Sequence, residues 1–175
     1  VLSVETLSGI KYLSLQVVNG KVKTVTVNMG KAEAKEEKIL EIDGENVSVI
    51  PVSVGNPHAV IFVDDIEKAP LYTLGPKIEH HKEFKDGVNV EFVEVISPDK
   101  LRMRVWERGS GVTSACGTGA CAAVSAAIST KKSNYGETVS VLLDGGTLKI
   151  EISPDNTVEM TGPAEFIYEG ETEIC

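Results

Sequence analysis

Residues 117–131 have the sequence GTGACAAVSAAISTK, which predicts a helix of an unusual kind. Alanine is the strongest helix former, and Lys131 and Lys132 lie at the end where cations interact favourably with the helix dipole. Apart from its Ser and Thr residues the segment is apolar on every side, and such a helix is normally buried all round. Because its side chains are small, strands can approach closely. We therefore expect a curved or barrel-like sheet wrapped around one central helix.

The rest of the chain has mainly the period of two that is typical of strands. Asn19-Gly20 and Asp43-Gly44 each separate two alternating runs, and such pairs favour hairpins because both turn residues tolerate positive φ. Residues 88–107 predict a further hairpin, with its turn at Ser97-Pro98-Asp99. The predicted strands are 11–18, 21–28, 39–42, 46–54, 58–64, 88–95, 101–107, 139–143, 147–152, 157–160 and 164–168.

A second helical segment is predicted at 66–81, where apolar residues have helical spacing. Pro70, Gly75 and Pro76 disfavour one long straight helix there. With many strands and few helices, the sequence predicts an α+β fold.

Composition restricts the class of protein. Lys and Arg number 17 and Asp and Glu 26, a formal net charge of −9, whereas proteins that bind nucleic acid through phosphate contacts are usually basic. The apolar fraction of 42% is typical of a globular chain, and no apolar run approaches the ~20 residues that a membrane span requires. Residues 1–5 lack the features of a secretory signal. Three cysteines cannot form a disulfide framework, so we expect a reducing, cytoplasmic compartment.

The segment ERGSGVTSACGTGA (107–120) carries the clearest chemical pattern. It predicts a strand end, a glycine-rich loop and a helix that begins at or just after Cys116. Free backbone N–H groups and the positive end of the helix dipole meet at such a position, which predicts a lowered thiol pKa. The same N–H groups, unhindered at Gly117 and Gly119, predict a pocket for a carboxylate or phosphate. The alternative is an inert cysteine, because buried free cysteine is common.

Several other polar residues lie at predicted strand ends or in adjoining loops, where binding groups tend to gather. Asn56, in the loop 55–58, could present its amide to a carboxylate or simply form an Asx turn. His58 is either an acid–base group or an ordinary strand residue. The remaining candidates of this kind are Asn89, Glu107 and Arg108.

The other cysteines are weaker candidates. Cys121 lies about 140° around the helix from Cys116 and is expected to face the sheet. Cys175 ends the chain and is expected to be disordered. A zinc site is not expected, because the two helix cysteines diverge and no histidine has ligand spacing to them.

These strings together resemble diaminopimelate epimerase, a family of cofactor-independent amino-acid epimerases of lysine and peptidoglycan biosynthesis. The resemblance implies two similar domains, each a β-barrel around a central helix, with diaminopimelate bound between them. It further implies a homodimer that needs no cofactor or metal. The matching stretches are VNMG (27–30), GNPHAVIFVDD (55–65), GVNVEF (87–92), the run from Arg104 through ERGSGVTSACGTGACAA to Ala123, and TGPAEFIYEGE (161–171).

The resemblance also implies roles for individual residues. Cys116 matches one of the family's two catalytic thiols, and His58 and Glu107 match positions that the family associates with activity near that thiol. Gly117 and Thr118 would bind substrate through the helix N-terminus. The full set of implied substrate contacts is Asn56, Asn89, Glu107, Arg108, Gly117 and Thr118.

One part of the family pattern is absent. The family uses one cysteine per domain on opposite faces of the substrate α-carbon, and its first-domain string of the Cys-Gly-Asn-Gly type does not occur here. We therefore expect the C-terminal part of an epimerase, inactive alone for want of the second thiol. Its expected parts are late first-domain strands at 1–28, the second domain at 29–162 and a return to the first domain at 163–175.

Two alternatives to the epimerase stay open. One is a relative of the same architecture, such as a proline racemase or a phenazine-pathway isomerase. The other is a non-catalytic ligand-binding or self-associating module, which the missing cysteine favours. Asn56 and Asn89 together favour the epimerase. In every case we expect the strands at 1–28 and 163–175 to promote self-association, because unpaired strand edges pair readily with another copy.

Overall fold

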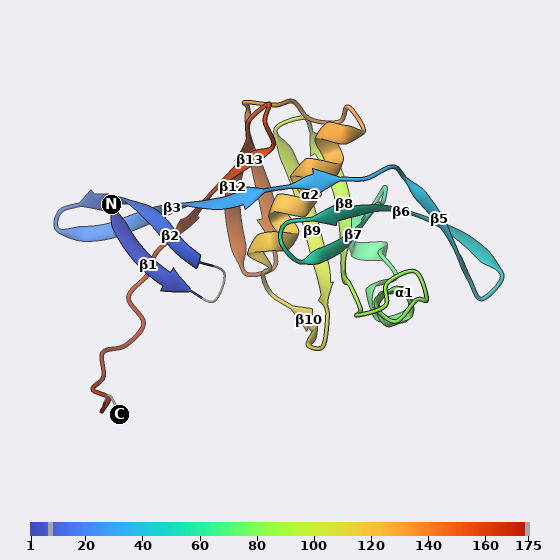
Figure 1. Ribbon diagram of the computed structural model, residues 1–175, viewed down its shortest axis with the longest axis horizontal. Coiled ribbons are helices and arrows are strands. Elements are labelled where there is room, and N and C mark those ends of the chain that lie inside the picture. Colours follow the sequence, from blue (N-terminus) through green and yellow to red (C-terminus); the bar gives the residue numbers. More distant parts are fainter. Residues whose placement is uncertain (7–8, 174–175) are drawn as a thin grey trace.

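A computed structural model describes residues 1–6 and 9–173, and its centre is the helix α2 (Gly117–Ser129) (Figure 1). Every residue of α2 from Gly119 to Ile128 is buried, so the predicted burial on all sides is confirmed. The helix ends two residues earlier than expected because Thr130 caps it and Lys131 takes a φ of 60°.

Among residues 1–6 and 9–173, thirteen strands form one sheet. Most neighbours are antiparallel, but the seventh and eighth strands pair in parallel, as do the ninth and eleventh. The strands are β1 (Leu2–Thr6), β2 (Gly9–Val18), β3 (Lys21–Lys31), β4 (Glu33–Ala34), β5 (Lys38–Ile42), β6 (Glu45–Ser53), β7 (Pro57–Phe62), β8 (Asn89–Ser97), β9 (Lys100–Glu107), β10 (Gly111–Thr113), β11 (Thr138–Leu143), β12 (Gly146–Ile152) and β13 (Thr157–Pro163).

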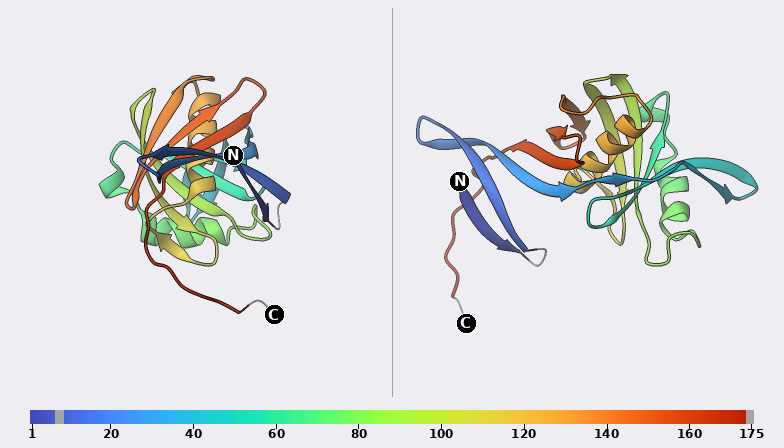
Figure 2. Two further views of the ribbon diagram at one scale, coloured as in Figure 1. Left: turned by 90° about the vertical axis from the view of Figure 1, so that its left-hand side faces the viewer. Right: turned by 45° about the horizontal axis from the view of Figure 1, so that its top comes forward.

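The sheet curves around α2 without closing into a barrel (Figures 1 and 2). Its strand order is β1-β2-β3-β13-β12-β11-β9-β8-β7-β6-β4, with β10 on β9 and β5 on β6. β3 leaves β13 where Ala32 donates its N–H to Asn156 O at 3.0 Å, and the chain then passes to β6 as β4. In the described residues, β3 and β4 are therefore joined by the chain and not by a ladder. The α+β class and the curved sheet around a central helix are confirmed, and among the described residues the sheet is not closed into the β-barrel that the resemblance implied.

Both predicted tight hairpins are confirmed. Asn19 and Gly20 have φ of 50° and 75° between β2 and β3, and Asp43 and Gly44 have φ of 55° and 82° between β5 and β6. β8 and β9 form the third predicted hairpin.

The predicted strand at 164–168 is wrong. β13 ends at Pro163, and Ala164 makes one further bond, from its N–H to Lys23 O at 3.0 Å. Phe166, Ile167 and Tyr168 are more than 80% exposed, and no strand pairs with them in the described part of the chain. An alternating apolar pattern does not form a strand where no ladder partner is beside it.

The second helical segment is interrupted, as the prolines predicted. It consists of a short 3-10 helix, η1 (Ile66–Lys68), and α1 (Leu71–Glu79), which contains Pro76. α1 packs on the opposite face of the sheet from α2, where Leu71 and Ile78 contribute to a second core with Phe92. Neither helix among the described residues is long and apolar enough to span a membrane.

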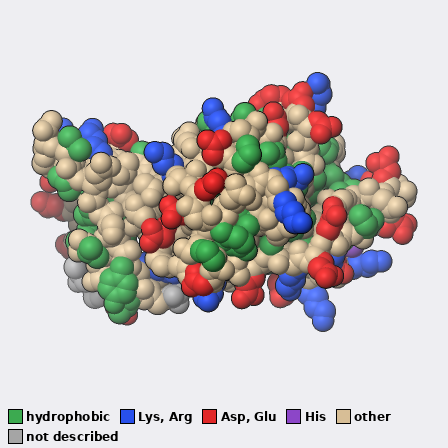
Figure 3. Space-filling model, turned by 90° about the horizontal axis from the view of Figure 1, so that it is seen from above, with side chains coloured by type: hydrophobic (Ala, Val, Ile, Leu, Met, Phe, Trp, Pro, Cys, Tyr) green, Lys and Arg blue, Asp and Glu red, His purple; other side chains and the backbone are tan. Residues whose placement is uncertain are grey.

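The surface of the molecule has two features, a projecting ribbon and a mixed distribution of charge. The strands β1 and β2 and the first half of β3 project from the body as a ribbon (Figures 1 and 2). On the face shown in Figure 3, acidic and basic side chains are interspersed and hydrophobic side chains occur in small groups, so the net negative charge does not gather in one area there.

Candidate active site

Cys116 is the N-cap of α2. Its backbone is extended, with φ of −139° and ψ of 110°, and its Sγ accepts the N–H of Gly119 at 3.4 Å. The first two helical residues, Gly117 and Thr118, have N–H groups that no intrahelical carbonyl accepts. The predicted placement of a thiol beside free helix N–H groups is therefore confirmed.

The predicted lowering of the Cys116 pKa is wrong. Burial raises the pKa of this thiol to about 11, and the nearby carboxylates of Glu91 and Glu107 act in the same direction. The N–H of Gly119 and the hydroxyl of Thr118 lower the pKa, but not enough to offset burial. The helix N-terminus lies within the curved sheet, so the cost of removing water from a thiolate exceeds the benefit of the helix end.

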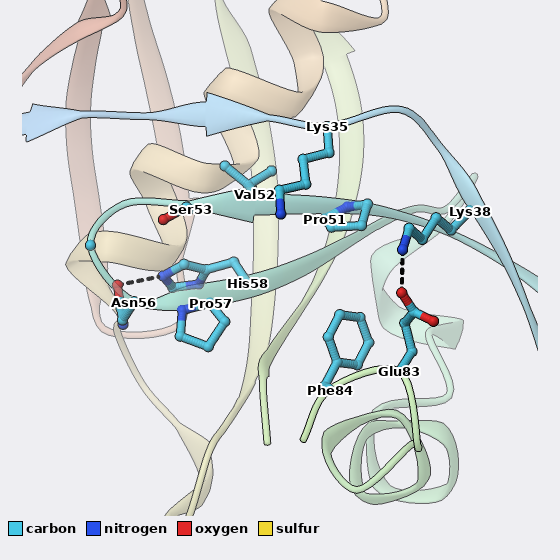
Figure 4. A pocket seen from close by; sticks show the side chains of 11 residues that line it. Lys35, Lys38, Pro51, Val52, Ser53, Asn56, Pro57, His58, Glu83 and Phe84 are labelled. Carbon is cyan, nitrogen blue, oxygen red and sulfur yellow. Dashed lines mark hydrogen bonds and ion pairs between the residues drawn. The ribbon is translucent and has the colours of Figure 1, made fainter. Parts of the chain in front are cut away.

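A chain of contacts joins Cys116 to the loop between β6 and β7. Cys116 Sγ lies 3.7 Å from Thr118 Oγ1, and Asn56 Nδ2 donates to that same hydroxyl at 3.3 Å. Asn56 Oδ1 lies 3.0 Å from His58 Nε2, and the two side chains point toward one another (Figure 4). The structure thus brings together four of the predicted site residues.

Glu91 completes this chain and was missed by the sequence analysis. Its side chain is fully buried, and its Oε1 lies 2.6 Å from His58 Nδ1. Its Oε2 has no hydrogen-bond partner among the described residues. Glu91 lies on the same face of β8 as Asn89 and Val93, the face toward α2. A glutamate inside a strand flanked by valine and phenylalanine was the available signal.

Asn89 ties two loops of the site together. Its Nδ2 donates to Pro57 O at 3.0 Å, and its Oδ1 accepts the backbone N–H of Arg108, also at 3.0 Å. Asn89 therefore fixes the loop that carries Asn56 against the loop that carries Arg108.

Glu107 and Arg108 lie at the end of β9. The hydroxyl of Thr113, on the unpredicted strand β10, donates to Glu107. The Arg108 side chain is exposed and donates from Nη1 to Asp86 O at 3.2 Å. Its guanidinium therefore keeps most of its donors for other partners.

A second buried carboxylate supports this end of β9. Glu79 accepts Trp106 Nε1 at 2.6 Å and the N–H of Gly109 at 2.8 Å. Burial acts to raise the pKa of Glu79, but these two hydrogen bonds and the charges of His80 and Arg108 outweigh it, and the pKa is lowered.

The remaining cysteine positions differ from Cys116. Cys121 is fully buried, and burial raises its pKa to about 12. Neither Cys116 nor Cys121 is in a disulfide. Cys175 lies outside the described residues. Within residues 1–6 and 9–173, no three His, Cys, Asp or Glu side chains are grouped so that they could hold a metal ion.

Two open depressions adjoin the loop of Asn56. One of about 580 Å³ reaches Thr118 and is also lined by Lys11 and Lys31. The other, of about 300 Å³, reaches His58 and is bordered by Lys38, which pairs with Glu83 (Figure 4).

The chain resembles known proteins over most of its length. The family model described as diaminopimelate epimerase matches residues 50–167. A diaminopimelate epimerase of Geobacillus thermodenitrificans is 48% identical over 181 residues, covering 95% of this chain and 62% of that protein. One of Acetivibrio thermocellus is 47% identical, covering 99% and 66%. The chain thus spans a little under two thirds of these curated relatives.

Solved structures share the fold at low sequence identity. A probable proline racemase from Agrobacterium radiobacter has a TM-score of 0.71 at 16% identity, covering 96% of this chain and 60% of that one. A phenazine biosynthesis protein of the PhzF family from Bacillus anthracis has a TM-score of 0.71 at 14% identity, covering 98% and 68%.

Proposed function

This chain belongs to the diaminopimelate epimerase family, and we propose that it provides one side of an active site that interconverts LL- and meso-diaminopimelate without a cofactor, in lysine and peptidoglycan biosynthesis. The observation that carries the proposal is the Cys116 thiol at the N-terminus of the buried helix α2, beside the free N–H groups of Gly117 and Thr118. Curated epimerases at 46–48% identity favour this substrate over those of the proline racemase and phenazine proteins, which are 14–16% identical.

The proposed chemistry is proton transfer at the α-carbon. Cys116 removes or returns the α-proton on one face of the substrate. With its pKa raised to about 11, Cys116 rests as the thiol in this chain, the form that returns a proton to the α-carbon. To remove the α-proton it must first become the thiolate, which the Gly119 N–H and the Thr118 hydroxyl stabilise.

The helix N-terminus stabilises the intermediate. When the α-proton leaves, negative charge spreads onto the substrate α-carboxylate. Bound at the N–H groups of Gly117 and Thr118, that carboxylate meets fixed donors and the positive end of the α2 dipole. Because these donors are already oriented in the resting protein, they need no rearrangement during the reaction.

The other predicted residues take supporting roles in this proposal. Asn56, Asn89 and Arg108 contact the polar groups of the substrate, with the exposed guanidinium of Arg108 suited to a carboxylate. Glu107 and His58 tune the charge around Cys116.

Inversion also needs an acid or base on the opposite face of the α-carbon. Cys121 does not suit that role, because it is fully buried within α2 and its pKa is raised to about 12. We therefore propose that a second cysteine outside residues 1–175 supplies the opposite face, and that the 175 residues alone have negligible epimerase activity. The division into parts at 1–28, 29–162 and 163–175, a homodimeric state and a cytoplasmic location remain proposals of the same kind.

Substrate protection tests the proposal. In a Cys121→Ala, Cys175→Ser background, iodoacetamide modifies Cys116 alone, and mass spectrometry follows the rate at pH 9. We expect millimolar meso- or LL-diaminopimelate to slow the reaction, proline to leave it unchanged, and Arg108→Ala to remove the protection without changing the rate in the absence of ligand. Equal protection by proline, or no protection by diaminopimelate, would refute the proposed substrate.

A further inference from the structure

Glu91 has a position that stability does not explain. A fully buried carboxylate with an unpartnered oxygen is costly and rare in folded proteins, yet Glu91 is 0% exposed and its Oε2 has no partner within the described residues. The only hydrogen bond of its side chain among the described residues joins Oε1 and His58 Nδ1 at 2.6 Å, and both side chains are wholly buried. What Glu91 does must therefore pass through His58 or act on its immediate neighbours.

The contacts beyond His58 indicate where the protons lie. His58 Nε2 faces Asn56 Oδ1 at 3.0 Å, an amide oxygen that has no hydrogen to give, so this contact is a hydrogen bond when Nε2 carries the proton and donates. A second proton lies in the bond between Glu91 Oε1 and His58 Nδ1. Turned this way, Asn56 presents its Nδ2 to Thr118 Oγ1.

The last link reaches the sulfur. The Thr118 hydroxyl accepts from Asn56, so its own hydrogen is free to donate to Cys116 Sγ, 3.7 Å away. If His58 Nε2 instead lacked its proton, the Asn56 amide would turn round. Its oxygen would then take the Thr118 hydrogen, and Cys116 would lose this donor.

We propose that Glu91 is a positioning residue for Cys116. By holding His58, it sets the direction of the Glu91–His58–Asn56–Thr118 chain so that the Thr118 hydroxyl donates to the sulfur. The consequence for the epimerase reaction rests on the proposed function. The direction of the hydrogen bonds is a property of the resting protein.

Glu91 also lies against the thiol by a shorter route. A Cβ built on Gly119 would be 2.9 Å from Glu91 Oε1 and 3.1 Å from Cys116 Sγ, so only a glycine separates the two groups. Through space, the negative charge of Glu91 destabilises the Cys116 thiolate. Through the Glu91–His58–Asn56–Thr118 series of hydrogen bonds, Glu91 stabilises that thiolate. A single Glu91 variant changes both effects, so the test must separate the effect of the hydrogen-bond series from the effect of the charge.

A double-mutant cycle separates the effect of the hydrogen-bond series from that of the Glu91 charge. With Cys116 as the sole thiol, alkylation at pH 8 reports the thiolate fraction, because this is well below the pKa of about 11. Thr118→Val should slow alkylation about three- to tenfold, the value of one hydrogen bond. In a Glu91→Met background, the same Thr118→Val change should have less than about a twofold effect. Equal slowing in both backgrounds would overturn the proposal.

Two further variants distinguish a loss of the hydrogen-bond series from a general destabilisation of the fold. One is a matched control and the other is a rescue. Glu79→Gln alters the other buried carboxylate, and there Thr118→Val should keep its full effect. Glu91→Gln can still donate to His58 Nδ1 and leave the proton on Nε2, so it too should keep the full effect. Loss of the Thr118 effect in either variant would contradict the proposed chain.

One measurement needs no variant. In the unmodified chain labelled with ¹⁵N-histidine, NMR should show a proton on His58 Nε2 at pH 7, and an unprotonated Nε2 would overturn the proposal. Neither experiment uses diaminopimelate. Failure of diaminopimelate to protect Cys116 would therefore refute the proposed function alone, whereas an additive cycle would refute the role of Glu91 alone.

Discussion

Gly119→Ala is expected to destabilise the protein, although the same change in an ordinary helix stabilises it by about 1 kcal/mol. Gly119 lies within α2, where its backbone is helical and would accept alanine. A Cβ there would lie 2.9 Å from Glu91 Oε1, 3.1 Å from Cys116 Sγ and 3.2 Å from Cys116 Cβ. Glu91 is fully buried and held by His58, so it cannot move aside without breaking that contact.

The size of the effect follows from two opposing contributions to the free energy of unfolding. The added methyl group strains a packed site, and alanine has the higher helix propensity. Overpacking of a well-packed site costs about 1–3 kcal/mol, and strain on the buried Glu91–His58 pair adds to it. After subtracting the gain in helix propensity, we expect a net loss of about 1–2 kcal/mol, or about 0.5–1 M in urea midpoint.

Urea unfolding followed by circular dichroism measures this loss. Gly117→Ala is the matched control. A Cβ at Gly117 would have Met160 Sδ as its nearest neighbour, at 3.1 Å. Because Met160 is half-buried and flexible, it can move aside, and we expect little change in the urea midpoint. A Gly119→Ala protein more stable than the parent would refute the close contact between Glu91, Gly119 and Cys116.

Three further outcomes are expected. Alkylation of Cys116 should rise about tenfold per pH unit from pH 7 to 10, because burial raises its pKa to about 11; a plateau near pH 7 would mean that the thiolate is already formed. Ala123→Leu, at a fully buried site, should cost about 1–3 kcal/mol in urea unfolding, while Ser129→Leu, exposed on the same helix, should cost little. The projecting ribbon exposes Ile10 and Tyr12, so sedimentation should show concentration-dependent self-association that Tyr12→Glu weakens; a strictly monomeric chain would contradict this.

Features that depend on neighbouring residues alone were predictable from the sequence. Asn19-Gly20 and Asp43-Gly44 specify tight turns because few other pairs tolerate positive φ at both positions. The composition of 117–131 predicted a buried helix because a helix with apolar side chains on every side is normally buried.

Features that depend on distant residues were not predictable. The helix N-terminus at Cys116 is a local signal for a low pKa, whereas the burial and the Glu91 charge that reverse it come from the wrapped sheet. Glu91 itself was hidden within an apolar strand, and its importance is visible only with His58 beside it. The strand expected at 164–168 had the right pattern but no partner among the described strands.

The role of Cys116 is tested most directly by a chimera. The part of the Geobacillus thermodenitrificans epimerase that this chain does not match is joined to residues 1–175, and chiral chromatography follows the conversion of LL- to meso-diaminopimelate. We expect the chimera to invert the substrate, Cys121→Ala to leave inversion in place, and Cys116→Ser to reduce it about 10²–10⁴-fold, the usual contribution of a general acid–base group. Inversion by the Cys116→Ser chimera at the rate of its parent would contradict the assignment of Cys116 as a proton-transferring thiol.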